Sequence, residues 1–259
     1  MARLRGLVGP VLAFLLAFAL LIALGLWQLR RLTWKTELLA QIAERTTAPP
    51  QPLPPADTWP SLRPVDYAYR HVVLTGTFLH GDEAHVFRPL SAETARGPFH
   101  GLGDLVLTPL RLDDGRVVIV NRGFVPQDRL AASARPTGQI PGRVVVTGLM
   151  REPESRNPFT PADDPGAGTW FTRDPAAMAA WFHIEGVAPF TIDADAGALP
   201  GGLPQGGETV LDIPNNHLSY AMTWFGLAGG LCLVFAGVIW NRVVPRGAGP
   251  PDATAAKRL

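Results

Sequence analysis

The sequence predicts a membrane protein whose two transmembrane α-helices flank a mainly antiparallel β domain of the α+β class, with barrel-like or sandwich-like packing. Two uncharged apolar runs predict the helices, one between Arg5 and Arg30 and one between Asp212 and Arg242. Each run exceeds the roughly 20 residues that a helix needs to cross about 30 Å of hydrocarbon. Between them lie short runs of β-branched and aromatic residues bounded by Gly, Pro or Asp, which are typical of strands.

The first apolar run is predicted to be an uncleaved anchor. A cleaved signal peptide is the alternative, because Arg3 and Arg5 precede the run and residues 17–19 resemble a cleavage site. The apolar core of a signal peptide has only about 7–15 residues, however. This run is longer, and it ends in Trp27, an aromatic residue suited to the membrane interface. Helical spacing of apolar residues continues beyond Trp27, which predicts a helical extension.

The basic residues near the ends of the two runs predict the orientation. Six lie in the tails and three near the other ends of the runs: Arg3, Arg5, Arg242, Arg246, Lys257 and Arg258 against Arg30, Arg31 and Lys35. Because basic residues favour the cytoplasmic side, both tails are predicted to be cytoplasmic and the central domain periplasmic. Arg far outnumbers Lys, so we interpret the chain as a multi-pass protein of a bacterial inner membrane.

The expected boundaries follow from these patterns. They are residues 1–6 for a cytoplasmic tail, 7–29 for the first transmembrane helix, 30–47 for its helical extension, 48–60 for a proline-rich linker, 61–214 for the periplasmic β-rich domain, 215–240 for the second transmembrane helix and 241–259 for a second cytoplasmic tail. Proline forbids helix in the linker and favours a stiff extended connector.

The central domain is acidic and has eight predicted strands. Residues 45–212 contain 14 Arg and 19 Asp plus Glu, a net charge of −5, so nucleic acid is not an expected partner. The strands are expected within residues 70–80, 83–90, 104–112, 116–125, 143–150, 169–174, 188–193 and 208–213. Asp114 and Gly115 are typical of a hairpin turn. Asp174 can cap one helix, and residues 193–209 are interpreted as a mobile loop.

The central domain has no convincing catalytic constellation, so an enzyme is not predicted. It lacks Gly-x-Ser-x-Gly, a phosphate loop, His-Glu-x-x-His and Cys-x-x-Cys. His80, Asp82 and His85 could bind a metal if a turn folded them together, but such residues are more often a solvated hairpin loop. We interpret Arg122 as pairing with a carboxylate and Gly123 as permitting a β-bulge.

The outer ends of the two predicted membrane helices carry a cluster of polar and aromatic residues. Four residues with i, i+3, i+4 and i+7 spacing share one face of the second helix: His217, Tyr220, Ala221 and Trp224. A second set lies at the same predicted depth at the end of the first helix: Gly25, Trp27, Gln28 and Arg31. Asn215 or Asn216 can cap the second helix. Deeper in that helix, Gly226 and Gly230 allow close approach of another helix or a flat ligand.

Two interpretations of this cluster stay open. The first is a belt of His, Tyr and Trp side chains that anchors the helices at the level of the lipid headgroups. The second is a haem site, because a neutral imidazole is a standard axial ligand of haem iron. Arg30 or Arg31 could then face the propionates, and the membrane could accommodate a long prenyl tail.

The chain resembles the Surfeit locus protein one family in three ordered motifs and two flanking helices. The motifs are Gly25-x-Trp27-Gln28-x-x-Arg31, TPLRLDDGRVVIVNRGFVP at residues 108–126 and NNHLSYAMTWFGLA at residues 215–228. Phe124 departs from the family, which often has Trp there, and GLGDLVLTPL lacks the aromatic residue often found after the glycine. Neither departure touches the membrane histidine.

The resemblance implies a cytochrome c oxidase assembly factor that binds haem a in the membrane and assists its insertion into oxidase subunit I. Haem a would be transient cargo received from the haem a synthase. The resemblance implies His217 as the axial ligand of the iron, within a cofactor-binding set of His217, Tyr220, Trp224, Trp27, Gln28 and Arg31. Two alternatives remain: a structural chaperone that holds subunit I without binding haem, and a membrane-anchored enzyme, which the missing catalytic motifs disfavour.

Overall fold

The computed structural model describes residues 8–197, 200–209 and 214–243. The chain divides into two compact units, which we describe separately. One unit contains the residues up to Leu39 and those from Ile213 onward, and the other contains Ala40–Asp212.

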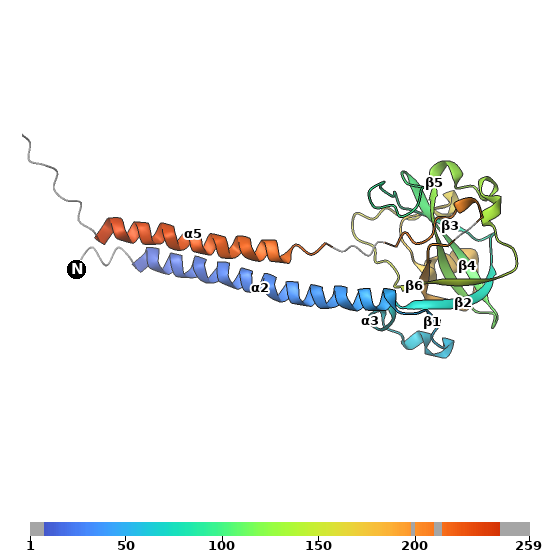
Figure 1. The fold of residues 1–259 in the computed structure, drawn as a ribbon, viewed down its shortest axis with the longest axis horizontal. Coiled ribbons are helices and arrows are strands. Elements are labelled where there is room, and N and C mark those ends of the chain that lie inside the picture. Colours follow the sequence, from blue (N-terminus) through green and yellow to red (C-terminus); the bar gives the residue numbers. More distant parts are fainter. Residues whose placement is uncertain (1–7, 198–199, 210–213, 244–259) are drawn as a thin grey trace, which may run out of the picture. The chain divides into compact units, whose positions relative to one another are not determined.

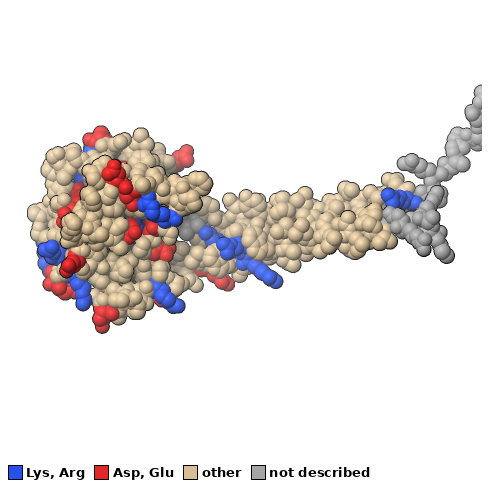
Figure 2. Space-filling model, turned by 180° about the vertical axis from the view of Figure 1, so that it is seen from behind, with Lys and Arg blue, Asp and Glu red and all other residues tan. Residues whose placement is uncertain are grey.

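The first unit is a pair of apolar helices, α2 (Val8–Thr47) and α5 (His217–Val243), which lie side by side (Figure 1). The two helices run antiparallel, because Phe14 near the start of α2 stacks on Phe235 near the end of α5, with ring centroids 4.2 Å apart. Both helices are long and apolar enough to cross a membrane. Much of their apolar surface is exposed, which supports membrane association, and their uncharged length appears tan in Figure 2.

The second unit is the β domain. Its strands are β1 (Gln51–Pro52), β2 (His71–Phe78), β3 (Ala84–Phe87), β4 (Gly103–Leu112), β5 (Val117–Pro126), β6 (Arg143–Arg151), β7 (Thr169–Trp170) and β8 (Val187–Ala194). Its α-helices are α3 (Pro64–Tyr67) and α4 (Pro175–Phe182). Short 3-10 turns lie at Ala56–Ser61, Gln127–Arg129, Ala132–Ala134, Pro136–Gly138, Pro165–Ala167 and Pro200–Gly202.

Five of these strands close a barrel in the order β2, β6, β8, β5, β4 and back to β2. All of the pairings within it are antiparallel except that of β5 with β8. The predicted two-helix, mainly antiparallel architecture is therefore confirmed. Burial alternates along β2, so Val72 and Leu74 enter the core, whereas β5 is buried almost throughout. The largest apolar cluster gathers around Phe190, with Trp59 and Tyr67 against its ring.

Local signals in the sequence produce the expected local structure. The Asp114 carboxylate accepts a hydrogen bond from the backbone N–H of Arg116 at 3.0 Å, and Gly115 has a φ of 87°, as a tight hairpin turn requires. The Asp174 carboxylate caps α4 by accepting from the N–H groups of Ala176 and Ala177. Both predictions are confirmed, because a turn and a cap depend only on neighbouring residues.

The bulge at Gly123 and the pairing of Arg122 with a carboxylate, both predicted, are also confirmed, and the structure shows that this ion pair is buried. Gly123 has a φ of 123°, and the register between β4 and β5 shifts beside it. A side chain at Gly123 would collide with the backbone of Gln205. Arg122 donates to the Glu83 carboxylate at 3.1 Å.

Two segments behave differently from their sequence-based expectation. The proline-rich residues 48–60 were expected to be a connector, but β1 pairs with β2 and Trp59 is buried in the core, so the segment belongs to the β domain. Residues 193–209 were expected to be a mobile loop, but Asp193 and Ala194 belong to β8, and Gln205 pairs with Phe124 through two backbone hydrogen bonds. The last predicted strand, residues 208–213, has no strand at 208–209, and 210–213 lie outside the described residues.

The residues that follow α2 are attached to the β domain through His71. Its Nδ1 lies 2.9 Å from the carbonyl oxygen of Ala48, the first residue after α2, and its Nε2 lies 2.7 Å from the Asp195 carboxylate. Burial by itself would lower the pKa of His71, but these two acceptors outweigh burial and raise it above its usual value. The doubly protonated ring satisfies both contacts.

Candidate functional site

A hydrogen bond joins the two apolar helices at the predicted interfacial cluster. Nδ1 of His217 lies 2.8 Å from Oε1 of Gln28, although the two residues are 189 positions apart in the sequence. Gln28 is buried between the helices. One turn along α2, Gly25 faces the ring of Phe225, where an added Cβ would lie only 2.5 Å from Cε1. The glycine thus allows the close helix approach that brings Gln28 to His217.

This contact determines the form of the imidazole. An amide oxygen can only accept, so Nδ1 of His217 carries the hydrogen and donates it to Gln28. In the neutral ring, Nε2 then has its lone pair free. Nε2 has no hydrogen-bond partner among the residues that the structure describes, and it is not among the fully buried atoms. The site therefore holds an oriented imidazole with one accessible ligand atom.

The other predicted site residues lie around this contact in different environments. Trp224 is half-buried. Tyr220 and Trp27 are exposed, with 56% and 55% of their surface accessible. Arg31 is exposed and lies over the ring of Trp34 at 4.5 Å. The structure thus brings Gln28 to His217 and leaves the two aromatic residues and Arg31 on the surface of the helix pair. Asn216 accepts the backbone N–H of Tyr220 through its carbonyl oxygen at 3.2 Å, as expected for a residue at the helix start.

An apolar groove of about 480 Å³ lies along the same helix pair. It is lined by Ala17, Leu20, Leu21, Gly226, Leu227, Gly230 and Leu231. A Cβ added to Gly226 or Gly230 would meet no atom within 4 Å, so these glycines face open space and are not used for packing α5 against α2.

Helical spacing places the other site residues on the groove side of the pair. On α5, Tyr220 and Trp224 continue the row of Leu227 and Leu231 with alternating steps of four and three residues. On α2, the same alternation relates the groove residues to the outer cluster in the row Ala17, Leu20, Leu24, Trp27 and Arg31. Because such steps keep residues on one helix face, a continuous surface runs from the groove to Trp27, Arg31, Tyr220 and Trp224.

Comparison with known proteins identifies the relatives of this chain. The SURF1 family model matches residues 15–229. Surfeit locus protein 1 of Homo sapiens is 37% identical over 229 residues, covering 85% of this chain and 71% of that protein. Surfeit locus protein 1 of Takifugu rubripes is 37% identical over 232 residues, covering 83% and 92%. A SURF1-like protein of Drosophila melanogaster is 34% identical over 248 residues, covering 91% and 80%.

The chain belongs to the SURF1 family. The matched range contains the Gln28–His217 contact, the whole described β domain and the groove except for Gly230 and Leu231. The three motifs that predicted this membership are found on defined elements. The first is on α2, the second is on strands β4 and β5 and the turn between them, and the third is at the start of α5.

In this SURF1-family chain, His80 and His85 of the β domain lie beside structural partners. His80 pairs through Nε2 with the carbonyl oxygen of Ile140 at 2.9 Å, and Nε2 of His85 lies 3.7 Å from the Glu83 carboxylate. Within the described ranges, no three His, Cys, Asp or Glu side chains are grouped so as to hold a metal ion. Asp82 lies in the turn between β2 and β3, as expected for a loop residue, but His80, Asp82 and His85 are half-buried and not fully solvated.

Sequence reasoning missed a second polar cluster of the SURF1-family fold, centred on Asp193 in β8. Its carboxylate accepts from Asn121, Arg173, Arg151 and Thr209. Burial by itself would raise the pKa of Asp193, but the charges of Arg173 and Arg151 outweigh burial and lower it. The residues come from five separate segments, so no local spacing in the sequence could have revealed the cluster.

Proposed function

We propose that this protein is a cytochrome c oxidase assembly factor that binds haem a in the membrane and assists its insertion into oxidase subunit I. The observation that carries the proposal is the hydrogen bond from Nδ1 of His217 to Gln28, which leaves Nε2 free. A histidine that ligates a metal almost always donates its other ring N–H to an acceptor, which fixes the tautomer and the ring orientation. Gln28 is that acceptor here.

Each residue of the cluster would have a distinct role toward the haem. His217 would ligate the iron through Nε2, and Gln28 would orient the imidazole. Tyr220, Trp224 and Trp27 would contact the macrocycle with their aromatic faces. Arg31 would pair with a propionate. The prenyl tail of haem a would lie in the apolar groove, whose liners continue the same helix faces.

We also propose a cellular location and a membrane orientation for the protein. The tails would lie in the cytoplasm and the β domain in the periplasm of a bacterial inner membrane, because six basic residues flank the tail ends of the helices and three flank the other ends. Haem a would arrive from the haem a synthase as transient cargo. The protein would not be an enzyme, since it would hold and transfer a cofactor without converting it.

A second candidate function is a structural chaperone that holds subunit I without binding haem. The open face at Gly226 and Gly230 favours it, because small residues permit a helix of another protein to approach closely. The two functions differ in one measurable property, which is whether the purified protein carries haem a.

The test is the reduced-minus-oxidised spectrum of protein purified from cells that make haem a. Wild type should show a haem a spectrum. His217→Ala should show a weakened or spectrally altered one, because one of at most two strong iron ligands is lost. Gln28→Leu preserves the helix packing volume but removes the acceptor, so haem affinity should fall by roughly 10- to 100-fold, as for other partners of metal-binding histidines.

A matched control is His100→Ala, which removes an exposed histidine of the β domain and should leave haem occupancy unchanged. If His217→Ala keeps the wild-type spectrum and occupancy, His217 is a residue of an interfacial belt. If wild type carries no haem under these conditions, the chaperone function is favoured.

A further inference from the structure

We propose that the β domain has a separate binding site for a small monocarboxylate, in a cavity beside the Asp193 cluster. The cavity measures about 200 Å³, and its lining includes Arg88, Asn121, Arg151, Glu154, Arg173 and Asp193. It is smaller than the roughly 300–1,000 Å³ of pockets for drug-sized ligands. The site therefore suits a compact ligand.

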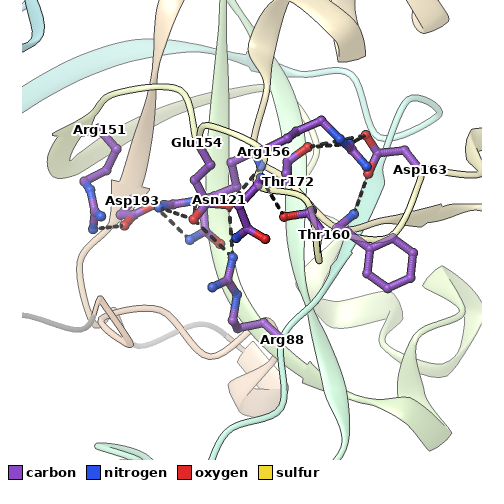
Figure 3. Close-up of polar contacts among 12 residues, drawn as sticks. Arg88, Asn121, Arg151, Glu154, Arg156, Thr160, Asp163, Thr172 and Asp193 are labelled. Carbon is purple, nitrogen blue, oxygen red and sulfur yellow. Dashed lines mark hydrogen bonds and ion pairs between the residues drawn. The ribbon is translucent and has the colours of Figure 1, made fainter.

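The two carboxylates at the centre of the cluster have no acceptor position left. Each oxygen of Asp193 accepts two hydrogen bonds, from Asn121 and Arg173 on one side and from Arg151 and Thr209 on the other. The Glu154 carboxylate accepts from the Arg88 and Arg173 side chains and from the backbone of Arg173. Figure 3 shows the Arg88, Arg151 and Asn121 side chains directed toward these two acids.

The guanidinium groups of Arg151 and Arg88, by contrast, have N–H groups without a hydrogen-bond acceptor among the described residues. Arg151 donates only through Nη1, and within the described part of the chain its Nε and Nη2 have no partner. These two N–H groups form one edge of the guanidinium, which is the edge that binds a carboxylate in bidentate fashion. Neither is a fully buried atom. Arg151 is held in place by stacking over Tyr69 at 4.6 Å and by its bond to Asp193.

Arg88 adds further donors at the mouth of the cavity. It is paired with Glu154 through Nη2 alone, and its side chain is 46% exposed. Since the central acceptors are saturated and the guanidinium groups beside them have free N–H donors, a ligand that binds at the centre of the cluster must supply acceptor oxygens. An anion meets this requirement better than a cation or a neutral donor.

Charge and shape narrow the anion to a monocarboxylate. Three guanidinium groups face the Glu154 and Asp193 carboxylates, which leaves one positive charge at the cluster. Glu208 at the rim accepts from the backbone N–H groups of Arg96 and Gly97, and its negative charge brings the net charge of the lining to zero. A phosphate dianion is thus disfavoured. The wall of Leu90, Leu105 and Phe124 is apolar, so the carboxylate should carry a small apolar group.

The test uses the purified full chain in detergent at constant ionic strength and pH 7, titrated by calorimetry and by thermal unfolding. The probes are butyrate, its neutral analogue butyramide, inorganic phosphate and a short peptide that ends in a leucine with a free carboxylate. Butyrate should bind and raise the unfolding temperature, whereas butyramide and phosphate should do so at least tenfold more weakly. Comparison of butyrate with the peptide distinguishes a free acid from a protein C-terminus as the source of the carboxylate.

Two variants and one matched control decide the outcome. Arg151→Gln should weaken butyrate binding at least tenfold. Arg88→Gln changes a half-exposed side chain and should weaken binding severalfold, so it tests the proposal even if Arg151→Gln does not fold. Arg143→Gln removes the same charge from an exposed pair with Asp113 and should bind as wild type does. Equal effects of butyrate and butyramide, or undiminished binding by folded Arg88→Gln, would overturn the proposal.

Discussion

The Glu83→Gln substitution should destabilise the β domain strongly, because it leaves two buried guanidinium groups without a counter-ion. Glu83 accepts from Arg122 at 3.1 Å and from both Nη atoms of Arg135. The side chains of Glu83, Arg122 and Arg135 are 7%, 3% and 2% exposed. Removing one partner of a buried ion pair typically costs about 3–5 kcal/mol.

The lowered pKa of Glu83 supports a loss of stability of this magnitude and predicts how the loss depends on pH. Burial by itself would raise the pKa of Glu83, but contacts with His85 and Arg135 and the charges of Arg135 and Arg122 outweigh burial and lower it from 4.5 to about 2. A difference of that size corresponds to about 3 kcal/mol of stability. Because the folded pKa lies below the unfolded one, the contribution is complete above pH of about 5 and is lost as the pH falls toward 2.

Arg122 shows the opposing cost of burying the network. Burial lowers the pKa of Arg122 to about 10, and the charge of Arg135 acts in the same direction against the attraction of Glu83. The three residues together therefore contribute less to the free energy of unfolding than the pKa shift of Glu83 alone suggests. The loss expected for Glu83→Gln arises from the buried charges that this variant leaves without a counter-ion. Removing Arg122 together with Glu83, as in the Glu83→Gln and Arg122→Met double variant, should recover part of the stability.

The assay is hydrogen exchange of the β5 peptide in the full chain in detergent, measured across a urea series at several pH values. At pH 7, Glu83→Gln should lower the free energy of unfolding by about 3 kcal/mol. As the pH falls from about 5 toward 2 the difference from wild type should shrink, because Glu83 of the wild type becomes protonated first in the unfolded chain and then in the folded one. Asp113→Asn, in an exposed pair with Arg143, is the control and should behave as wild type does. A loss below about 1 kcal/mol at pH 7, or one independent of pH, would refute the reasoning.

Three further perturbations test other parts of the structure. Gly25→Val should separate the two apolar helices, because the valine side chain would overlap the Phe225 ring. Gly9→Val should not, because a side chain there would meet nothing within 4 Å. The separation is measured by cross-linking of cysteines introduced at Phe14 and Phe235, which stack on each other in the wild type. Because the pKa of His71 is raised, both of its contacts are made below that pKa, and one of them is lost as the pH rises through it. Hydrogen exchange just after α2 should therefore increase across this transition in wild type, but not in His71→Ala. Asp174→Ala should cost about 1 kcal/mol through loss of the α4 cap, measured by thermal unfolding, and Asp174→Asn should not.

The sequence by itself determined those features that depend on neighbouring residues. The two uncharged runs predict the apolar helices, since composition decides whether a helix of that length can lie in hydrocarbon. The Asp114 turn and the Asp174 cap follow from one or two side chains and the backbone beside them. The pairing of Arg122 with a carboxylate could also be anticipated, because a buried guanidinium requires a counter-charge, but its partner Glu83 could not be named.

Only the tertiary structure decided which distant residues meet. Gln28 was predicted to lie near His217, yet its part as the acceptor that orients the imidazole depends on the rotation of both helices about their axes, which Gly25 and Phe225 determine by packing. The Asp193 cluster needs β5, β6 and β8 in one register, and a shift of one residue would turn its side chains to the other face of the sheet. Such contacts depend on the relative placement of elements far apart in the chain, and local spacing carries no information about it.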